Sequence, residues 1–196
     1  MAPDINTLTE MILEQVVPES TITEDDAKAI SQHRDFLLGL EDDLVKTFYD
    51  SLYAHGPTAA IFEDGERPAR EETLRNWWRR TVEGPLDKDY FRWMTLVGVV
   101  HIRRGVKNPM MVSMTSVVAE FVREKASESL TPADVDSLVK ALSHLGSTVV
   151  SLISESYTSS YIDALQDLAG LKPELTERML TLEVKRREAE GRVALQ

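Results

Sequence analysis

The sequence has no cysteine among its 196 residues, which excludes several kinds of chemistry. Disulfides, thiolate nucleophiles, zinc–cysteine sites, iron–sulfur clusters and covalent CxxCH haem attachment all require cysteine. This composition fits a reducing compartment. The first residues, MAPDINTLTE, also lack the charged-then-apolar pattern of a secretory signal, so we expect a cytoplasmic protein.

Positive charge and long apolar runs are also scarce. The chain has 22 Lys and Arg against 33 Asp and Glu, a net charge of −11. Such a chain repels nucleic acid and anionic membranes, and its basic clusters, WWRR and IRR, are too short to form a nucleic-acid-binding stripe. The longest apolar run, at residues 94–100, is far too short to cross a bilayer. We therefore expect neither a nucleic-acid partner nor a membrane partner.

Glycine and proline are few, at 9 and 8 residues, and nowhere do Val, Ile and Thr alternate with polar residues for long. Apolar residues instead recur at helical spacing, which predicts an all-α fold. The predicted helices cover residues 4–17, 23–40, a segment around 44–53, 68–84, 88–104, 109–127 and 133–169.

The segment 171–196 differs in character from the rest of the chain. It holds six basic and five acidic residues, and its apolar residues alternate at spacings of four and three, with Arg186 interrupting: Leu175, Met179, Leu182, Ala189 and Val193. This spacing is typical of a short coiled coil. We expect a domain of residues 1–170 followed by a coiled-coil linker, 171–196, towards an output domain of a longer natural chain.

His101 lies in the apolar stretch LVGVVHIRRGVKNPMMVSM, residues 96–114, and shares one helix face with Met94 and Val97. One interpretation is a core histidine whose ring is satisfied by a backbone carbonyl. The other is a metal ligand, because neutral imidazole is the commonest one. The remaining histidines stand at positions 33, 55 and 144, so no pair has the spacing of a zinc or di-iron site. A lone histidine fits haem, in which the porphyrin supplies four nitrogens.

The segments KTFYDSLYAH, TLRNWWRR and VGVVHIRRGVKNPMM, followed by a long last helix, resemble the sensor globins. These are the globin domains of globin-coupled sensors and their relatives, the protoglobins. The resemblance covers about residues 20–170. It implies a globin fold with an N-terminal extension helix, no clear D helix, and a long C-terminal helix leading into the coiled-coil linker. It also implies that residues 1–170 form a sensor domain that binds haem b.

The resemblance assigns roles to two residues. His101 would be the proximal iron ligand, and Tyr49, of the pair Phe48–Tyr49, would hydrogen-bond the gas in the distal pocket. A phenolic hydroxyl in a dry pocket stabilises the partly negative O₂ by about 1–2 kcal/mol and CO by much less. Without the resemblance, Tyr49 would be read as a core tyrosine with its hydroxyl at the surface.

Further pocket residues are expected around this pair. The helix 68–84 should cross the haem at Thr73 and Leu74, with Trp77 in or near the pocket and Trp78 as packing. Arg104 could pair with a haem propionate, although a surface charge near a helix end is equally natural. The proximal side would be formed by an apolar group: Met94, Val97, Met110 and Met114.

These residues predict a sensor of O₂, CO or NO that regulates a C-terminal output. A histidine kinase of a two-component system is favoured over a diguanylate cyclase, and no catalytic residues of either are present in this stretch. We expect a homodimer through the helices 109–127 and 133–169. The alternatives are a haem-free globin-like dimerisation or docking module, which needs neither His101 nor Tyr49, and a stand-alone gas-binding globin, against which the segment 171–196 argues.

Overall fold

The computed structural model describes residues 3–195, which form two compact units, 3–157 and 158–195. Residues 3–195 contain helices and no strand, so the predicted all-α fold is confirmed. The helices are α1 (Ile5–Gln15), the 3-10 helix η1 (Pro18–Ser20), α2 (Glu24–Gln32), α3 (Arg34–Gly39), α4 (Glu41–Ala54), α5 (Gly56–Ala59), α6 (Arg67–Glu83), α7 (Lys88–Arg104), α8 (Asn108–Ser129), α9 (Pro132–Ala169) and α10 (Pro173–Ala194). Between α4 and α6 the structure has one helix, the four-residue α5, in keeping with the expected lack of a clear D helix.

Side-chain caps fix where several of these helices begin and end. The carboxylates of Asp4 and Asp87 accept hydrogen bonds from the first backbone N–H groups of α1 and α7. Thr23 and Asp26 form a reciprocal capping box at the start of α2. Gly105 ends α7 in the left-handed conformation, with φ of 71°, which a glycine adopts without steric cost.

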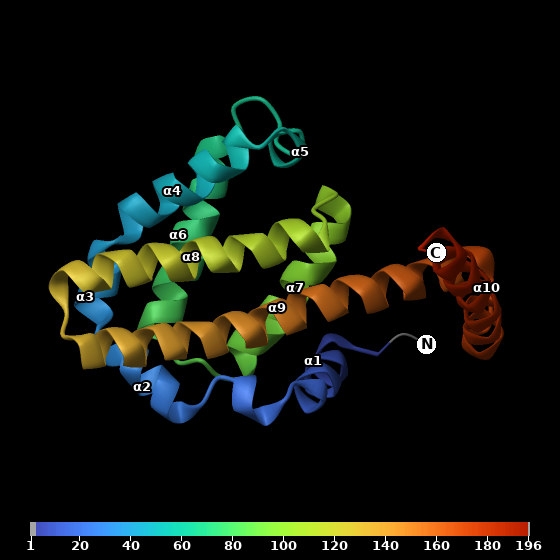
Figure 1. The fold of residues 1–196 in the computed structure, drawn as a ribbon, viewed down its shortest axis with the longest axis horizontal. Helices are drawn as coiled ribbons and strands as arrows, with labels where there is room; N and C mark the ends of the chain where they lie inside the picture. Colours follow the sequence, from blue (N-terminus) through green and yellow to red (C-terminus); the bar gives the residue numbers. More distant parts are fainter. Residues whose placement is uncertain (1–2, 196) are drawn as a thin grey trace. The chain divides into compact units, whose positions relative to one another are not determined.

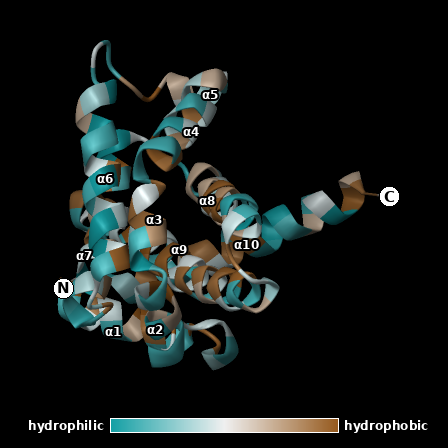
Figure 2. Cartoon of the chain, turned by 90° about the vertical axis from the view of Figure 1, so that its left-hand side faces the viewer, coloured by the Kyte–Doolittle hydropathy of each residue, from teal (hydrophilic) through white to brown (hydrophobic). Residues whose placement is uncertain are grey.

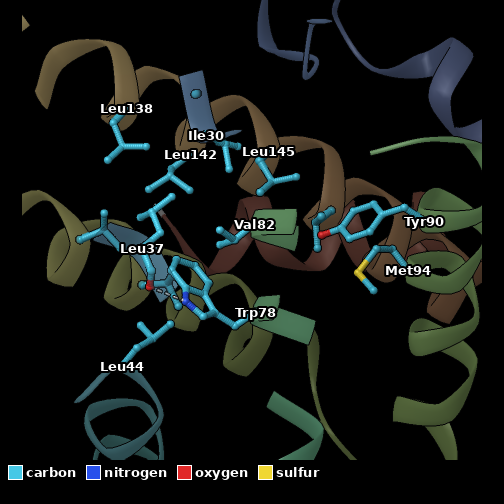
Figure 3. Packing of buried hydrophobic residues seen from close by; sticks show 14 of the residues in the cluster. Ile30, Leu37, Leu44, Trp78, Val82, Tyr90, Met94, Leu138, Leu142 and Leu145 are labelled. Atoms are coloured by element: carbon cyan, nitrogen blue, oxygen red, sulfur yellow. Dashed lines mark hydrogen bonds between the residues drawn. The ribbon is translucent and has the colours of Figure 1, made fainter. Parts of the chain in front are cut away.

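One predicted helix is two helices in the structure. The pattern over residues 23–40 predicted a continuous helix, but the backbone leaves the helical conformation at His33, between α2 and α3. At the break the backbone N–H of His33 donates to the carbonyl of Ile30, and the carbonyl oxygen of Ala29 lies 2.9 Å from Nδ1 of the His33 ring instead. Beyond the break, the indole Nε1 of Trp78 donates a 2.9 Å hydrogen bond to the carbonyl of Leu37, which joins α3 to α6 (Figure 3). The first helix is also shorter than predicted, because Val16 is already extended.

The core of the first unit draws on almost every helix in it. Figure 3 shows Trp78 and Val82 of α6 among side chains from α2, α3, α4, α7 and α9. The largest fully buried side chains include Trp78, Tyr90, Ile30, Leu37, Leu44, Met94, Leu138 and Leu152. Tyr90 keeps its hydroxyl satisfied at the centre of this core through a 2.9 Å hydrogen bond with Thr81.

The N-terminal extension is part of this unit. α1 packs on α7, with Leu8 and Ile12 buried and the hydroxyl of Thr9 donating to that of Thr95 at 2.9 Å. In Figures 1 and 2, α8 and the first part of α9 run between α4 on one side and α1 and α2 on the other, and α6 contacts α2, α3 and α4. Figure 2 also shows that α8 and α9 carry much of the hydrophobic sequence.

α9 is a helix of 38 residues and, within residues 3–195, the one helix long and apolar enough to span a membrane by length and composition. The sequence, in which the longest apolar run is at residues 94–100, did not predict this. Its apolar residues nevertheless line the core of the first unit, as expected of a central helix in a globular domain: Leu138, Leu142, Leu145, Val149, Leu152 and Ile153.

The second unit consists of the end of α9 and the helix α10. Gly170, with φ of 62°, ends α9, and Pro173 opens α10, so the long helix does not run directly into the last segment. No residue of α10 is buried in the described chain. The predicted domain boundary near residue 170 coincides with this helix end, whereas the compact first unit ends earlier, at Tyr157; the boundary stays a prediction.

Candidate functional site: an apolar cavity around His101

A cavity of about 470 Å³ lies inside the first unit, between α4, α6, α7, α8 and α9. Its volume falls within the roughly 300–1,000 Å³ of cofactor and small-molecule sites. Its lining is mainly aliphatic and aromatic side chains, with few polar groups among them. Such a lining suits a large apolar ligand that is oriented by a small number of polar contacts.

The eleven residues predicted for the pocket all line this one cavity. They are Phe48, Tyr49, Thr73, Leu74, Trp77, Met94, Val97, His101, Arg104, Met110 and Met114. They come from α4, α6, α7 and α8, so the fold brings together residues that are far apart in the sequence. Their roles towards a ligand stay predictions.

His101 is the one histidine of the chain that lines the cavity within the described structure. Its Nδ1 lies 2.7 Å from the sulfur of Met111, and its Nε2 has no hydrogen-bond partner among residues 3–195. Burial, and to a smaller extent the positive charge of Arg104, lowers the pKa of His101 to about 4. The ring is therefore neutral at pH 7, the form in which imidazole binds metals.

Tyr49 lines the same cavity from α4, with its ring edge-on to Phe48 and to Phe62. Its hydroxyl donates a 2.7 Å hydrogen bond to the backbone carbonyl of Arg70 on α6. Burial raises the pKa of this hydroxyl above its ordinary value, so Tyr49 remains a neutral donor. The alternative of a tyrosine with its hydroxyl at the surface does not describe this geometry.

Two guanidinium groups, those of Arg70 and Arg104, also line the cavity. Arg104 forms a bidentate ion pair with Glu66, with both N–O distances at 2.7 Å. Arg70 approaches the same carboxylate at 3.2 Å. The sequence predicts Arg104 either beside a propionate or as a surface charge. In the structure its partner is the carboxylate of Glu66, and a role towards a propionate stays a prediction.

Part of the cavity wall was not predicted from the sequence. Trp78, predicted as packing alone, is fully buried and also contributes to the cavity. Phe62, Trp93 and the α9 residues Leu142, Leu145 and Val149 line it as well. The α9 residues were recognised as one apolar face, but periodicity does not distinguish a face that fills the core from a face that borders a cavity.

Comparison with known families adds a second line of evidence. A family model for protoglobins matches residues 20–163. The chain belongs to the protoglobin family. No curated protein matches this protoglobin.

Protoglobins are haem-binding globins, and the cavity of this one fits such a group. The donor set is a single neutral imidazole with a free ring nitrogen, inside a wall of flat aromatic and flexible thioether side chains. Methionine adapts well to irregular space against flat rings. No cluster of three or more His, Asp or Glu side chains that could hold a bare metal ion occurs in the described part of the chain, whereas a porphyrin needs one protein ligand.

Proposed function

We propose that this protoglobin is a gas-sensing domain that binds haem b through His101 and reads a diatomic ligand, O₂, CO or NO, through Tyr49. The observation that carries the proposal is the single neutral imidazole of His101 in an apolar cavity that also contains the hydroxyl of Tyr49. A haem-free docking module has no need for this pairing. When bound, haem supplies an iron atom with an open position for a diatomic gas.

The protein residues contribute binding, orientation and selectivity. Nε2 of His101 is the nitrogen left for the metal, because Nδ1 is engaged with the thioether of Met111. A thioether is a weak hydrogen-bond acceptor, so the imidazole remains neutral rather than taking on imidazolate character. The aromatic residues Phe48, Trp77 and Trp93 make the cavity wall apolar, and a hydrogen bond from Tyr49 to a polar ligand is stronger in apolar surroundings than in water.

We also infer that the protein acts as a homodimer through α8 and α9 and passes its signal to a C-terminal output. The inward face of α9 is buried, whereas the residues of a second apolar face are half-buried: Val139, Gly146, Val150 and Tyr157. Val112 of α8 is exposed. A histidine kinase is the output we favour, and this rests on the resemblance to globin-coupled kinases alone.

The visible spectrum of the protein with and without His101 tests the proposal. The wild-type protein, supplied with haem, should show a Soret band at one haem per chain. His101→Ala should bind little haem, and added imidazole should restore the spectrum. His55→Ala is the matched control, because His55 is exposed and outside the cavity. Normal haem content and an unchanged spectrum in His101→Ala would contradict the proposal.

A further inference from the structure

α10 carries an apolar seam that nothing in its own unit covers. The seam follows spacings of four and three residues, and its apolar positions are exposed: Leu175 at 46%, Met179 at 54%, Leu182 at 69% and Val193 at 71%. At 100° per residue, these positions fall within one narrow stripe of the helix.

The opposite face of α10 is the one directed at α9. Thr176, Leu180 and Val184 line a shallow groove together with Ile162 and Gln166 from the end of α9. No seam residue lines this groove. The seam is therefore available to a partner while α10 rests on the end of α9.

Charge identifies that partner. With Leu175 and Leu182 as d positions and Met179 and Val193 as a positions of a heptad, both flanks of the seam are charged. The g positions, on one side, are Arg178, Lys185 and Arg192. The e positions, on the other side, are Thr176, Glu183 and Glu190. One helix thus presents a basic edge and an acidic edge along the same apolar stripe.

The charges at the two edges of the seam are complementary to those of a second α10 when the two helices are parallel. In a parallel, in-register pair, each g residue faces the e residue five positions later on the other helix. Arg178 then meets Glu183 of the partner subunit, and Lys185 meets Glu190 of the partner subunit. In an antiparallel pair, g faces g and e faces e, which places like charges opposite each other.

We propose that α10 pairs with α10 of a second copy of this chain as a parallel, in-register, two-stranded coiled coil. Arg186, at the remaining a position, does not prevent this. Its guanidinium reaches sideways to Glu183 and Glu190 of its own helix, at 2.5 Å each, so its aliphatic stem covers the seam while its charge lies outside. A single basic a residue fixes register at some cost in affinity.

α10 offers just three heptads, so this coil is weak as an isolated element. In the full chain, any contact between two copies elsewhere raises the effective concentration of one α10 near the other. The proposal is independent of haem and of the gas, since its residues lie outside the cavity.

Cysteine cross-linking in the full chain tests orientation and register, because the chain has no native cysteine. Leu175→Cys and Val193→Cys, at opposite ends of the seam, are made separately and oxidised under mild conditions. In a parallel, in-register pair, the introduced cysteine lies opposite the same cysteine of the second copy, so each variant forms covalent dimers by itself. Glu188→Cys, on the far side of α10 and outside the groove, is the control and should remain monomeric on a denaturing gel.

Other cross-linking patterns would overturn the proposal. Cross-linking of Leu175→Cys with Val193→Cys in a mixture, but of neither alone, means antiparallel pairing. Equal cross-linking of the seam variants and Glu188→Cys means that the helices are near each other without a seam. No cross-linking in any variant means that α10 does not pair.

Charge exchange in the Leu175→Cys background tests the partner. Glu183→Lys with Glu190→Lys makes both edges basic, and Arg178→Glu with Lys185→Glu makes both edges acidic. Each variant alone should cross-link roughly tenfold less than the parent, because four contacts become repulsive. A mixture of the two should restore cross-linking as heterodimers, which also shows that both variants still fold α10.

Glu174→Lys with Glu188→Lys, neither of which lines the groove, is the matched control. It makes the same change in net charge at positions away from the seam, and it should cross-link like the parent. Equal loss in this control, or a mixture that stays monomeric, would overturn the assignment of the two edges to a second copy of α10.

Discussion

The hydroxyl of Tyr49 on α4 is hydrogen-bonded to the backbone carbonyl of Arg70 on α6, at 2.7 Å. The hydroxyl is therefore satisfied by the protein alone, and it ties together two walls of the cavity. A gas ligand that takes this hydrogen bond must exchange it for the one to Arg70. Such an exchange couples ligand binding to the contact between α4 and α6, as a two-state sensor requires.

Tyr49→Phe should release O₂ roughly three- to tenfold faster and leave CO binding almost unchanged. The gain from hydrogen-bonding O₂ is offset by loss of the bond to Arg70, so the net effect is that of about one neutral hydrogen bond, ~1 kcal/mol. Stopped-flow measurement of O₂ dissociation and CO association compares the two gases. Equal changes for both would make Tyr49 a packing residue.

The same substitution has a consequence without any ligand. Loss of the Arg70 bond should lower the unfolding free energy by about 0.5–1.5 kcal/mol, measured by urea denaturation of the haem-free protein. Tyr53→Phe is the control, because Tyr53 lies one turn along α4, stacks on Phe62 and does not line the cavity. In the stopped-flow measurement of the haem-loaded protein, Tyr53→Phe should release O₂ at the wild-type rate.

The residues predicted for the pocket lie on helices whose 3.6-residue period can be recognised in the sequence, which is why they could be placed on common faces. Their roles towards a ligand stay predictions. Met94, Val97 and His101 follow helical spacing, and the structure places all three in the cavity wall. The Phe48–Tyr49 pair was found through resemblance to a family, which periodicity alone would not have supplied.

What the sequence did not reveal depends on contacts between distant residues. The hydrogen bond that joins α3 to α6 links Trp78 to Leu37, 41 positions apart. The partner of Arg104 is Glu66, 38 positions away in a loop. Local propensity contains no information on either contact, because one joins α6 to α3 and the other joins the residue before α6 to α7.

Asp26 joins α2 to α9 and predicts a pH dependence of stability. Its buried carboxylate accepts hydrogen bonds from Thr23 and from Nδ1 of His144, at 2.8 Å for the latter. Burial alone would raise its pKa, but the bonds from Thr23 and His144 outweigh it and lower the pKa of Asp26 in the folded protein. Its contribution is therefore present above the unfolded pKa, about 3.9, and is lost as pH falls through the lower folded value.

Asp26→Asn should then cost about 1–2 kcal/mol of unfolding free energy at pH 7 and less at pH 3, which lies below the unfolded pKa. Urea denaturation at the two pH values measures the difference. Asp25→Asn is the neighbouring control, because Asp25 is exposed and its ion pair with Lys28 lies at the surface. A cost for Asp26→Asn that does not change with pH would contradict the role of the carboxylate charge.

The ion pair of Arg104 with Glu66 predicts opposite effects of two substitutions on haem retention. Arg104 is the cation that could serve a propionate, and Glu66 competes for it. Arg104→Gln should speed haem loss to an excess of an apoglobin acceptor about three- to tenfold, whereas Glu66→Gln should slow it or leave it unchanged. Faster loss in both variants would mean that the pair acts by closing the cavity wall rather than by supplying a cation.

α7, the helix that carries His101, lies directly against α9 at Gly98. A Cβ at residue 98 would lie 2.0 Å from Oγ of Ser156 and 2.3 Å from the carbonyl oxygen of Ile153. The serine hydroxyl is itself engaged, donating to the carbonyl of Thr95 at 2.8 Å. Because one of the obstructing atoms is backbone, α7 and α9 must separate to admit even a methyl group.

Gly98→Ala should therefore destabilise the fold by about 1–3 kcal/mol, despite the higher helix propensity of alanine, and should weaken haem binding by displacing His101, one turn further along α7. Urea denaturation of the haem-free protein and haem titration measure the two effects. Gly39→Ala is the control: nothing lies within 4 Å of its Cβ position, so it should be neutral or slightly stabilising. If Gly98→Ala loses stability but keeps wild-type haem affinity, the spacing of α7 and α9 does not position His101; if it loses neither, the two helices are not held at this distance.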